Sequence, residues 1–287
     1  MSDNRFDIAI IGCGPAGVSA AITARIRNKS VLLIGDEISS KVEKAHAIQN
    51  YPGLPDIAGA DLAGAFLSHL EKMEIDITKK RVSTVYAMGD YFAIQADEEM
   101  LEARSVILAT GIVTGKSLPG EDELLGRGVS YCATCDASLY RGKSAIVIGY
   151  SKKEEREAAF LSEVCNEVIY IPVYKDETEL PDNVRVVREQ VKEIRSDGDK
   201  RIVITSEGEY ETDGVFVLRD AIAPDRLVPG LETDGGHVVV DRHMQTNLDG
   251  VFACGDIAGT PYQYIKAAGE GNVAALAAVK YLDEKGK

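Results

Sequence analysis

The 287-residue sequence has no apolar run that approaches the roughly 20 residues of a membrane-spanning helix. Residues 1–5 are polar and lead directly into a strand, so we expect no signal peptide. A content of 45% hydrophobic and 27% charged residues is typical of a globular protein, and no disordered segment is expected. We therefore expect a cytosolic protein that is long enough for two domains.

Positive charge is also in short supply. Lysine and arginine number 32 against 46 aspartates and glutamates, and the formal net charge is −14. This balance argues against nucleic acids and anionic membranes as partners.

Histidine and cysteine are sparse and mostly isolated. The four histidines show no metal-ligand spacing, and we assign them no chemistry: His46, His69, His237 and His243. Five cysteines in a cytosolic chain argue against a framework of structural disulfides. Cys165 is interpreted as a core residue.

One pair of cysteines is closely spaced, in the segment Cys132-Ala133-Thr134-Cys135-Asp136. Two thiols at this spacing can form a dithiol/disulfide couple, and Asp136 is close enough to move a proton. A helix entered at Ala133 would lower the pKa of Cys132 through its first-turn amides. The alternative is half of a zinc site, but zinc usually needs a second such pair. A redox role is therefore favoured.

The N-terminal segment predicts a dinucleotide site. An apolar strand over 6–11 is followed by Gly12-Cys13-Gly14-Pro15-Ala16-Gly17, a helix to about residue 28 and a strand over 30–34. The three glycines allow a tight turn, a close approach to pyrophosphate, and packing of helix on strand. Asp36, just after the second strand, is the candidate for a ribose hydroxyl, although it could equally be a solvated loop residue.

Further elements follow this start. We expect a helix over 59–73, short strands over 81–87, 91–96 and 101–104, and an apolar strand over 105–109. The last strand ends in Ala109-Thr110-Gly111, where small residues allow a second close approach of the backbone to a ligand.

A second βα unit begins after the cysteine pair, with strands over 144–148 and 167–171 and a helix to about residue 165. Strands are also expected over 184–187, 201–205 and 214–218. The turn is wrong for a nucleotide because Ser151 and Glu154 replace the second and third glycines, while Lys152, Lys153 and Glu155 crowd it. A glutamate here opposes phosphate both sterically and electrostatically.

The C-terminal segment returns to the first domain, with a strand ending at Gly255-Asp256 and a helix over 262–278. We expect an α/β protein of two Rossmann-like, three-layer domains. The first domain comprises residues 1–114 and 245–287, and the second, residues 115–244, is inserted into it. The crossings are expected near 113–116 and 242–246.

Together these motifs resemble the two-domain bacterial type of thioredoxin reductase over essentially the whole chain. The motifs that carry the resemblance occur in the family's order: the glycine-rich start, Asn50-Tyr51-Pro52-Gly53, Ala109-Thr110-Gly111, the cysteine pair, Gly255-Asp256 and Ala268-Gly269. The resemblance implies FAD in the discontinuous domain, a Cys132/Cys135 disulfide near the flavin, thioredoxin as electron acceptor, and a homodimer. It also implies that the inserted domain turns about its crossings.

The resemblance also implies that FAD is contacted by Gly12, Gly14, Ala16, Gly17, Asn50, Gly255, Asp256, and Gln263 with its neighbours Tyr264 and Ile265. The further candidates for FAD contact, from their places in or beside these motifs, are Pro15, Asp36, Lys41, Thr110 and Gly111. Cys13 and Cys254 stand where small residues are expected and are interpreted as space-filling residues near FAD. By analogy Cys135 faces the flavin, Cys132 attacks thioredoxin, and Asp136 protonates the leaving thiolate. Asp136 could also be a helix N-cap or first-turn acid.

Several positions depart from this family. Where it binds NADPH, the chain has Glu154 in place of an alanine and Pro172-Val173-Tyr174 in place of His-Arg-Arg. Near the flavin, Ser39-Ser40-Lys41 replaces Gly-Gly-Gln, and Tyr262 replaces an arginine. Tyr262 and Tyr264 could shield the flavin or simply pack. The pattern resembles the ferredoxin-linked flavin thioredoxin reductases, which implies ferredoxin as electron donor.

Three alternatives remain open: a dithiol oxidase that passes electrons to oxygen, an NADPH-dependent thioredoxin reductase, and a non-enzymatic flavin-binding redox partner or sensor. Ferredoxins are usually acidic, so docking to this acidic chain would need a local basic patch. Two clusters could supply it or could be solvated surface: Lys152, Lys153 and Arg156, or Arg127, Arg141 and Lys143.

Overall fold

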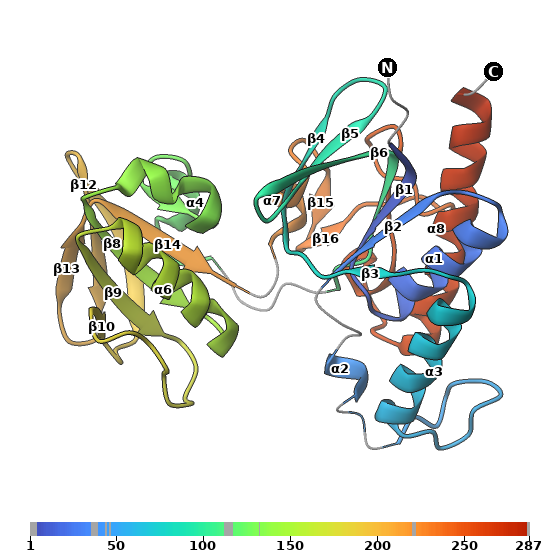
Figure 1. Cartoon of the computed structure of the whole chain (residues 1–287), viewed down its shortest axis with the longest axis horizontal. Helices are drawn as coiled ribbons and strands as arrows, with labels where there is room; N and C mark the ends of the chain where they lie inside the picture. Colours follow the sequence, from blue (N-terminus) through green and yellow to red (C-terminus); the bar gives the residue numbers. More distant parts are fainter. Residues whose placement is uncertain are drawn as a thin grey trace. The chain divides into compact units, whose positions relative to one another are not determined.

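The computed structural model describes residues 5–35, 40–43, 45, 47–111, 117–131, 133–219 and 222–285. The chain forms two compact units (Figure 1). Unit 1 comprises Met1–Val113 and Ala223–Lys287, and unit 2 comprises Thr114–Ile222. Among the described residues, no helix is long and apolar enough to cross a membrane.

Unit 1 is built on a seven-stranded sheet in the order β3-β2-β1-β6-β5-β4, with β17 also paired to β6. Its strands are β1 (Phe6–Ile11), β2 (Val31–Ile34), β3 (Ile77–Thr78), β4 (Val82–Ala87), β5 (Phe92–Ala96), β6 (Glu99–Leu108) and β17 (Val251–Ala253). The first half of β6 pairs with β5 in antiparallel fashion, and its second half pairs with β17 in parallel. This long strand therefore joins a parallel nucleotide-binding sheet to a hairpin.

Three helices cover one face of this sheet: α1 (Pro15–Ile26), α3 (Gly59–Lys72) and α8 (Tyr264–Lys285) (Figure 1). Their alanine-rich faces share one core with the apolar side chains of β1, β2, β6 and β17. Small residues let the helices approach closely: a Cβ atom on Gly271 of α8 would lie 2.1 Å from the carbonyl oxygen of Ala16 in α1. The start of α1 is thus held between the sheet and α8.

The expected strand, helix and strand at the N-terminus are confirmed, but β6 and the last helix of unit 1 differ in extent from the prediction. The strands expected over 101–104 and 105–109 are one strand, because β6 pairs continuously with β1 from Ala103 to Leu108. The last helix continues to Lys285 because its final turns still bury apolar residues. Tyr281, for example, packs edge-on against Phe252 with ring centroids 6.3 Å apart.

The second crossing also lies elsewhere than expected. Residues 223–244, placed with the inserted domain from the sequence, lie in unit 1, and the chain returns there at Ala223. Backbone contacts explain the difference: Ala253 of β17 donates to the Met244 carbonyl at 3.0 Å, and Glu232 donates to the Asn247 side chain at 2.9 Å. This segment contains the short elements α7 (Pro224–Leu227), β15 (Thr233–Asp234) and β16 (His237–Val238).

Unit 2 has a parallel sheet in the order β10-β9-β8-β14-β7. Its strands are β7 (Val129–Ser130), β8 (Ser144–Gly149), β9 (Glu167–Pro172), β10 (Val184–Val186) and β14 (Gly214–Leu218). On one face lies α6 (Glu155–Val164), and on the other lies the antiparallel meander β11 (Val191–Asp197), β12 (Lys200–Thr205) and β13 (Glu209–Thr212). A separate apolar core fills each interface.

Strands β11 and β13 were absent from the sequence prediction. Their segments are rich in charged residues, and most of their side chains are exposed because the meander covers the sheet with one face and meets water with the other. The remaining short elements of the chain are α2 (Ser40–Glu43), α4 (Glu121–Leu124), α5 (Ala133–Asp136) and the 3₁₀ turns η1 (Ala137–Tyr140), η2 (Lys152–Glu154) and η3 (Gly255–Ala258).

Candidate functional site

Three neighbouring parallel strands of unit 1 end together, and a predicted motif follows each. Gly12 follows β1, Ala109 follows β6, and Cys254 follows β17. Backbone bonds hold the three ends in register: Ala109 donates to Ile11 at 2.8 Å, and Cys254 donates to Leu108 at 2.9 Å. The carboxyl ends of strands in an open α/β sheet are where ligands bind, so these motifs are brought to one place.

At this place Gly12 and Gly17 must be glycines, because other backbone atoms lie directly against them. Gly12 has φ +113°, and a Cβ atom on it would lie 2.3 Å from the carbonyl oxygen of Ala109. A Cβ atom on Gly17 would lie 1.8 Å from the carbonyl oxygen of Gly12. Any larger residue would push α1 away from the turn, which is the role the sequence analysis assigned to these glycines.

The first turn of α1 is suited to an anion. The N-cap position is Gly14, which has no side chain to bond the free amides, and Pro15 follows at the first helical position. These amides point at the turn and carry the positive end of the helix dipole. Beside the turn, the buried hydroxyl of Thr110 has no hydrogen-bond partner within the described chain. At Gly111 a Cβ atom would meet no described atom within 4 Å. A buried hydroxyl without a partner among the described residues, and a glycine whose Cβ position meets no described atom, fit a bound dinucleotide.

The turn at Gly255 is fastened to α8 by a charged pair that the sequence analysis missed. The Gly255 N–H donates to a Glu270 carboxylate oxygen at 2.9 Å. Lys266 donates to the carbonyl oxygens of Gly255 (3.2 Å) and Gly259 (2.6 Å), and it lies 3.1 Å from Glu270. Both side chains are about four-fifths buried. In the sequence, this pair is indicated by the four-residue spacing of Lys266 and Glu270 on an expected helix. That spacing does not show that both side chains bind the turn before the helix.

Two other residues predicted to contact FAD, Asn50 and Gln263, lie together. The side-chain amide of Asn50 donates to the Gln263 side chain, although 213 positions separate them in sequence. Next to Gln263, Tyr262 shares a 2.7 Å hydrogen bond with His237, a histidine to which no role was assigned. Tyr264 packs against the core of unit 1, Ile265 is partly exposed, and Asp256 is half-buried in η3. Asp36 lies outside the described residues, and so does the side chain of Lys41.

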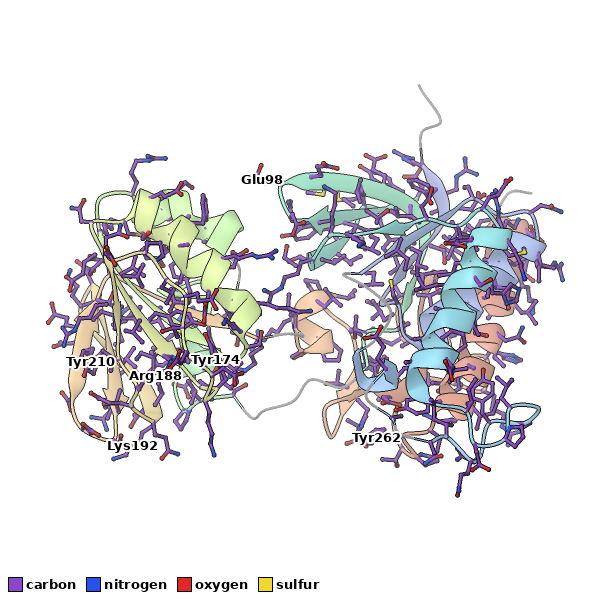
Figure 2. All side chains as sticks on the ribbon, turned by 60° about the horizontal axis from the view of Figure 1, so that its bottom comes forward. Glu98, Tyr174, Arg188, Lys192, Tyr210 and Tyr262 are labelled. Atoms are coloured by element: carbon purple, nitrogen blue, oxygen red, sulfur yellow. The ribbon has the colours of Figure 1, made fainter. Side chains whose placement is uncertain are left out.

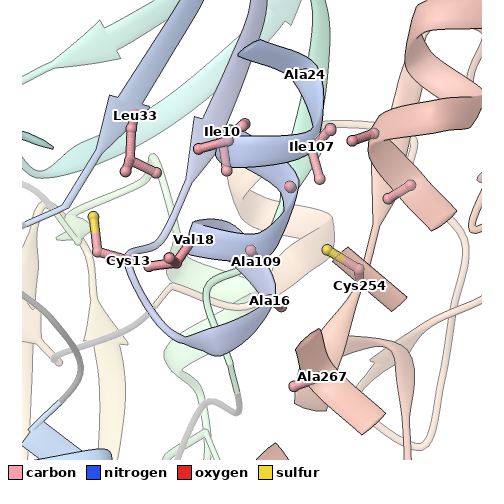
Figure 3. Packing of buried hydrophobic residues seen from close by; sticks show 14 of the residues in the cluster. Ile10, Cys13, Ala16, Val18, Ala24, Leu33, Ile107, Ala109, Cys254 and Ala267 are labelled. Carbon is pink, nitrogen blue, oxygen red and sulfur yellow. The ribbon is translucent and has the colours of Figure 1, made fainter. Parts of the chain in front are cut away.

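The two motif cysteines of unit 1 fill space, as expected. Cys254 is fully buried, and burial raises the pKa of its thiol. Cys13 is buried where its sulfur would meet a Cβ atom on Gly35 at 2.7 Å. Figure 3 shows both in the core that also holds Ala16, Ala109 and Ala267. Cys165 lies in the core between α6 and the sheet of unit 2, which confirms its interpretation as a core residue.

At the cysteine pair, the helix expected from Ala133 is present as α5, followed by the 3₁₀ turn η1. Asp136 is an acid in the first turn of α5, and its half-buried carboxylate contributes to raising the pKa of Tyr140, chiefly an effect of burial. Cys132 and the side chain of Cys135 lie outside the described residues. Among the described residues, no group of three or more His, Cys, Asp and Glu side chains is arranged to hold a metal ion.

The second βα turn, in unit 2, is lined by acids. Glu154, at the position of the third glycine, is buried at 3% exposure, and Glu155 is buried at 6%.

Two lysines of the possible basic patches have partners within unit 2. Lys152 pairs with Glu179 at 2.7 Å. The Lys143 ammonium lies over the ring of Tyr140, 5.8 Å from its centroid.

Comparison with known proteins agrees with this geometry. Residues 6–171 and 173–271 match the pyridine nucleotide-disulphide oxidoreductase family. Thioredoxin reductase of Bacillus subtilis is 30% identical over 99% of this chain and 97% of its own. A ferredoxin-flavin thioredoxin reductase from Clostridium acetobutylicum is 50% identical, with a TM-score of 0.92, and the match covers 100% of this chain and 99% of that one. A thioredoxin reductase from Gloeobacter violaceus is 28% identical, with a TM-score of 0.81 over 99% of this chain and 96% of its own.

The chain belongs to the thioredoxin reductases of the pyridine nucleotide-disulphide oxidoreductase family. Thioredoxin reductases of this family bind FAD, and FAD is the cofactor of this chain. The residues present fit it: glycines at the strand ends, free amides at α1 and the free hydroxyl of Thr110 can hold its diphosphate and ribityl groups. The discontinuous α/β fold expected from the sequence is that of the family.

Proposed function

We propose that this thioredoxin reductase takes its electrons from reduced ferredoxin and not from NADPH. The observation that carries the proposal is the pair of buried carboxylates, Glu154 and Glu155, at the turn of unit 2 that would receive nucleotide phosphates. Negative charge here repels phosphate at short range and in a poorly screened site. The 50% identity to a ferredoxin-flavin thioredoxin reductase supports the same donor.

The chemistry of the chain's own residues would centre on Cys132 and Cys135. Bound FAD supplies the link between one-electron and two-electron chemistry, because a flavin accepts electrons singly and passes them on in pairs. The Cys132/Cys135 disulfide takes up two electrons and two protons and becomes a dithiol. The Cys132 thiolate then attacks the thioredoxin disulfide, and Cys135 displaces the reduced thioredoxin from the mixed disulfide. Asp136 supplies a proton to the thiolate that leaves.

The direction of this transfer follows from typical reduction potentials. A ferredoxin near −400 mV and a thioredoxin near −270 mV differ by about 130 mV, which is roughly 6 kcal/mol for two electrons. The reaction from ferredoxin to thioredoxin is therefore strongly downhill. NADPH is not required to drive it.

Anaerobic titration of the flavin spectrum tests the proposal. Reduced ferredoxin, NADPH and NADH are added in turn to the FAD-loaded protein, and flavin absorbance is followed. We expect bleaching by ferredoxin alone, followed by stoichiometric reduction of added thioredoxin. Bleaching by NADPH, or none by ferredoxin, would contradict the proposal. Oxygen consumption with small dithiols would indicate a dithiol oxidase.

A cytoplasmic homodimer is the assembly and location we propose for this enzyme, by likeness to its family. Sedimentation of the FAD-loaded protein tests the assembly. A species of twice the 31.0 kDa chain mass is expected, and a monomer at micromolar concentration would contradict it.

A further inference from the structure

In a nucleotide-binding βαβ unit, the ligand lies across two segments: the first βα turn, which holds phosphate, and the loop after the second strand, which holds the ribose. In unit 2 these segments are residues 149–155, between β8 and α6, and residues 173–179, after β9. Side-chain contacts within the described residues join the two segments directly. We call these contacts the latch: Glu155 with Tyr174, Glu155 with Glu179, and Lys152 with Glu179.

Glu155 is the centre of the latch. It is the first residue of α6, and its buried carboxylate accepts hydrogen bonds from the Tyr174 hydroxyl and from the Glu179 backbone N–H, the latter at 2.9 Å. The Glu179 side chain in turn pairs with Lys152 at 2.7 Å. A carboxylate of the chain thus lies at a helix N-terminus and satisfies donors of the opposite loop, as a phosphate would.

Tyr170 fills the space beneath the latch. It is fully buried, and a Cβ atom on Gly149 would lie 2.1 Å from its hydroxyl oxygen. That hydroxyl lies 3.2 Å from the Tyr174 hydroxyl and donates to the Ser151 carbonyl at 3.5 Å. Gly149, the first glycine of the motif and the one that normally allows the tight turn, here makes room for an aromatic ring of the same unit.

Both tyrosines keep their protons under ordinary conditions. Burial, opposed in part by the bond to Tyr174, raises the pKa of Tyr170 to about 12. Burial and the bond to Glu155 raise the pKa of Tyr174, whose side chain is labelled in Figure 2. Tyr174 therefore remains a donor to the Glu155 carboxylate across the physiological pH range, and the latch does not open by tyrosine ionisation.

We propose that Glu155 acts as an internal ligand of unit 2, and that the latch it holds, more than the charge of Glu154, excludes nucleotides of every kind from the first βα turn of that unit. The inference rests on the proposed function, because it explains how an NADPH-type unit came to serve only as the carrier of the cysteine pair. Glu155 is then the specificity-determining residue of unit 2, and the exclusion extends beyond NADPH to any phosphate-bearing nucleotide.

Binding to the oxidised, FAD-loaded protein tests the proposal. The probes are inorganic pyrophosphate and NADP⁺, measured by isothermal titration calorimetry. The wild type is compared with the double variant Glu155→Ala, Tyr174→Ala. Glu163→Ala is the matched control, since it removes the same charge from an exposed position on α6. We expect the wild type and the control to bind neither probe, and the double variant to bind pyrophosphate at least about tenfold more tightly than the wild-type detection limit. Nucleotide binding by wild-type unit 2, or no gain in the folded double variant, would overturn the proposal.

Hydrogen exchange gives a second measurement if the double variant folds poorly. In Glu155→Gln, exchange at the Glu179 amide is expected to rise by roughly tenfold, since that amide loses a charged acceptor. Glu163→Gln should leave it unchanged. Equal exchange in Glu155→Gln and the wild type would show that the latch is not formed. Neither measurement uses an electron donor. The proposal for the latch can therefore be contradicted while ferredoxin dependence is confirmed, and ferredoxin dependence can be contradicted while the latch is confirmed.

Discussion

The guanidinium of Arg219 lies against the carboxylate of Glu121, which is wholly buried; one of the two hydrogen bonds between them, from Nη2 to Oε2, is 2.7 Å long. Glu121 also accepts the Leu118 N–H at 2.8 Å, and Arg219 lies over the ring of Tyr150, 4.4 Å from its centroid. Leu118 is close to the beginning of unit 2 and Arg219 is close to its end. The pair therefore ties together the two ends of the inserted segment.

Glu121→Gln is expected to destabilise unit 2 by about 3 kcal/mol, because it leaves the charge of Arg219 buried without its partner. Urea unfolding followed by circular dichroism measures the loss. Glu193→Gln, which breaks the exposed pair with Arg195, serves as the control and should leave the free energy of unfolding close to that of the wild type. Equal stability of the two variants would contradict a structural role for the buried pair.

Gly17→Ala is expected to yield protein that retains little FAD, because its Cβ atom would lie 1.8 Å from the Gly12 carbonyl oxygen and displace the first turn of α1. The ratio of flavin to protein absorbance after purification measures this. Gly64→Ala, on α3, meets no described atom within 4 Å. That control should bind FAD fully and gain about 0.5–1 kcal/mol of stability.

Lys266→Met is expected to weaken FAD binding about tenfold, since it removes the bonds that fasten the 255–259 turn to α8. Fluorescence titration of apoprotein with FAD gives the dissociation constant. Lys280→Met, at an exposed position on the same helix, should bind FAD like the wild type. If the two variants bind FAD alike, Lys266 does not position this turn.

Because the pKa of Asp213 is lowered in the folded protein, we expect unit 2 to lose stability in acid. Hydrogen bonds from Lys200 and from the Ser144 backbone lower its pKa from 3.8 to about 2. Because the folded state favours the carboxylate, the stabilisation is complete above about pH 4 and disappears as pH falls toward 2. Asp213→Asn should therefore cost about 1–2 kcal/mol at pH 7, with the difference from wild type shrinking below pH 4. A difference independent of pH would exclude this origin.

Alkylation should distinguish the three buried cysteines from Cys132 and Cys135. Cys13, Cys165 and Cys254 are buried, and burial raises the pKa of the last two thiols. We expect iodoacetamide to modify only Cys132 and Cys135, and only after reduction of the native protein. Mass spectrometry of tryptic peptides measures this. Modification of Cys254 in the folded protein would contradict the packing of the FAD-binding unit.

Much of the fold could be predicted from the sequence because it follows from local patterns. The apolar strand at residues 6–11, the glycine-rich turn and the alanine-rich helix follow from short-range constraints on backbone and side-chain size. Strands β11 and β13 were missed because their charged segments cover a sheet with only one face. The return to unit 1 at Ala223 was missed because long-range hydrogen bonds decide it.

The sequence by itself determined the family and, with it, FAD as the cofactor; it also predicted the FAD-binding motifs, the redox pair Cys132 and Cys135, and the loss of the nucleotide motif at Ser151 and Glu154. Each of these depends on residue type at fixed spacing. Only the tertiary structure decided what fills the lost site. Glu155 and Tyr174 are 19 positions apart, and their bond exists because the first turn of α6 and the loop after β9 are brought together at one end of the sheet.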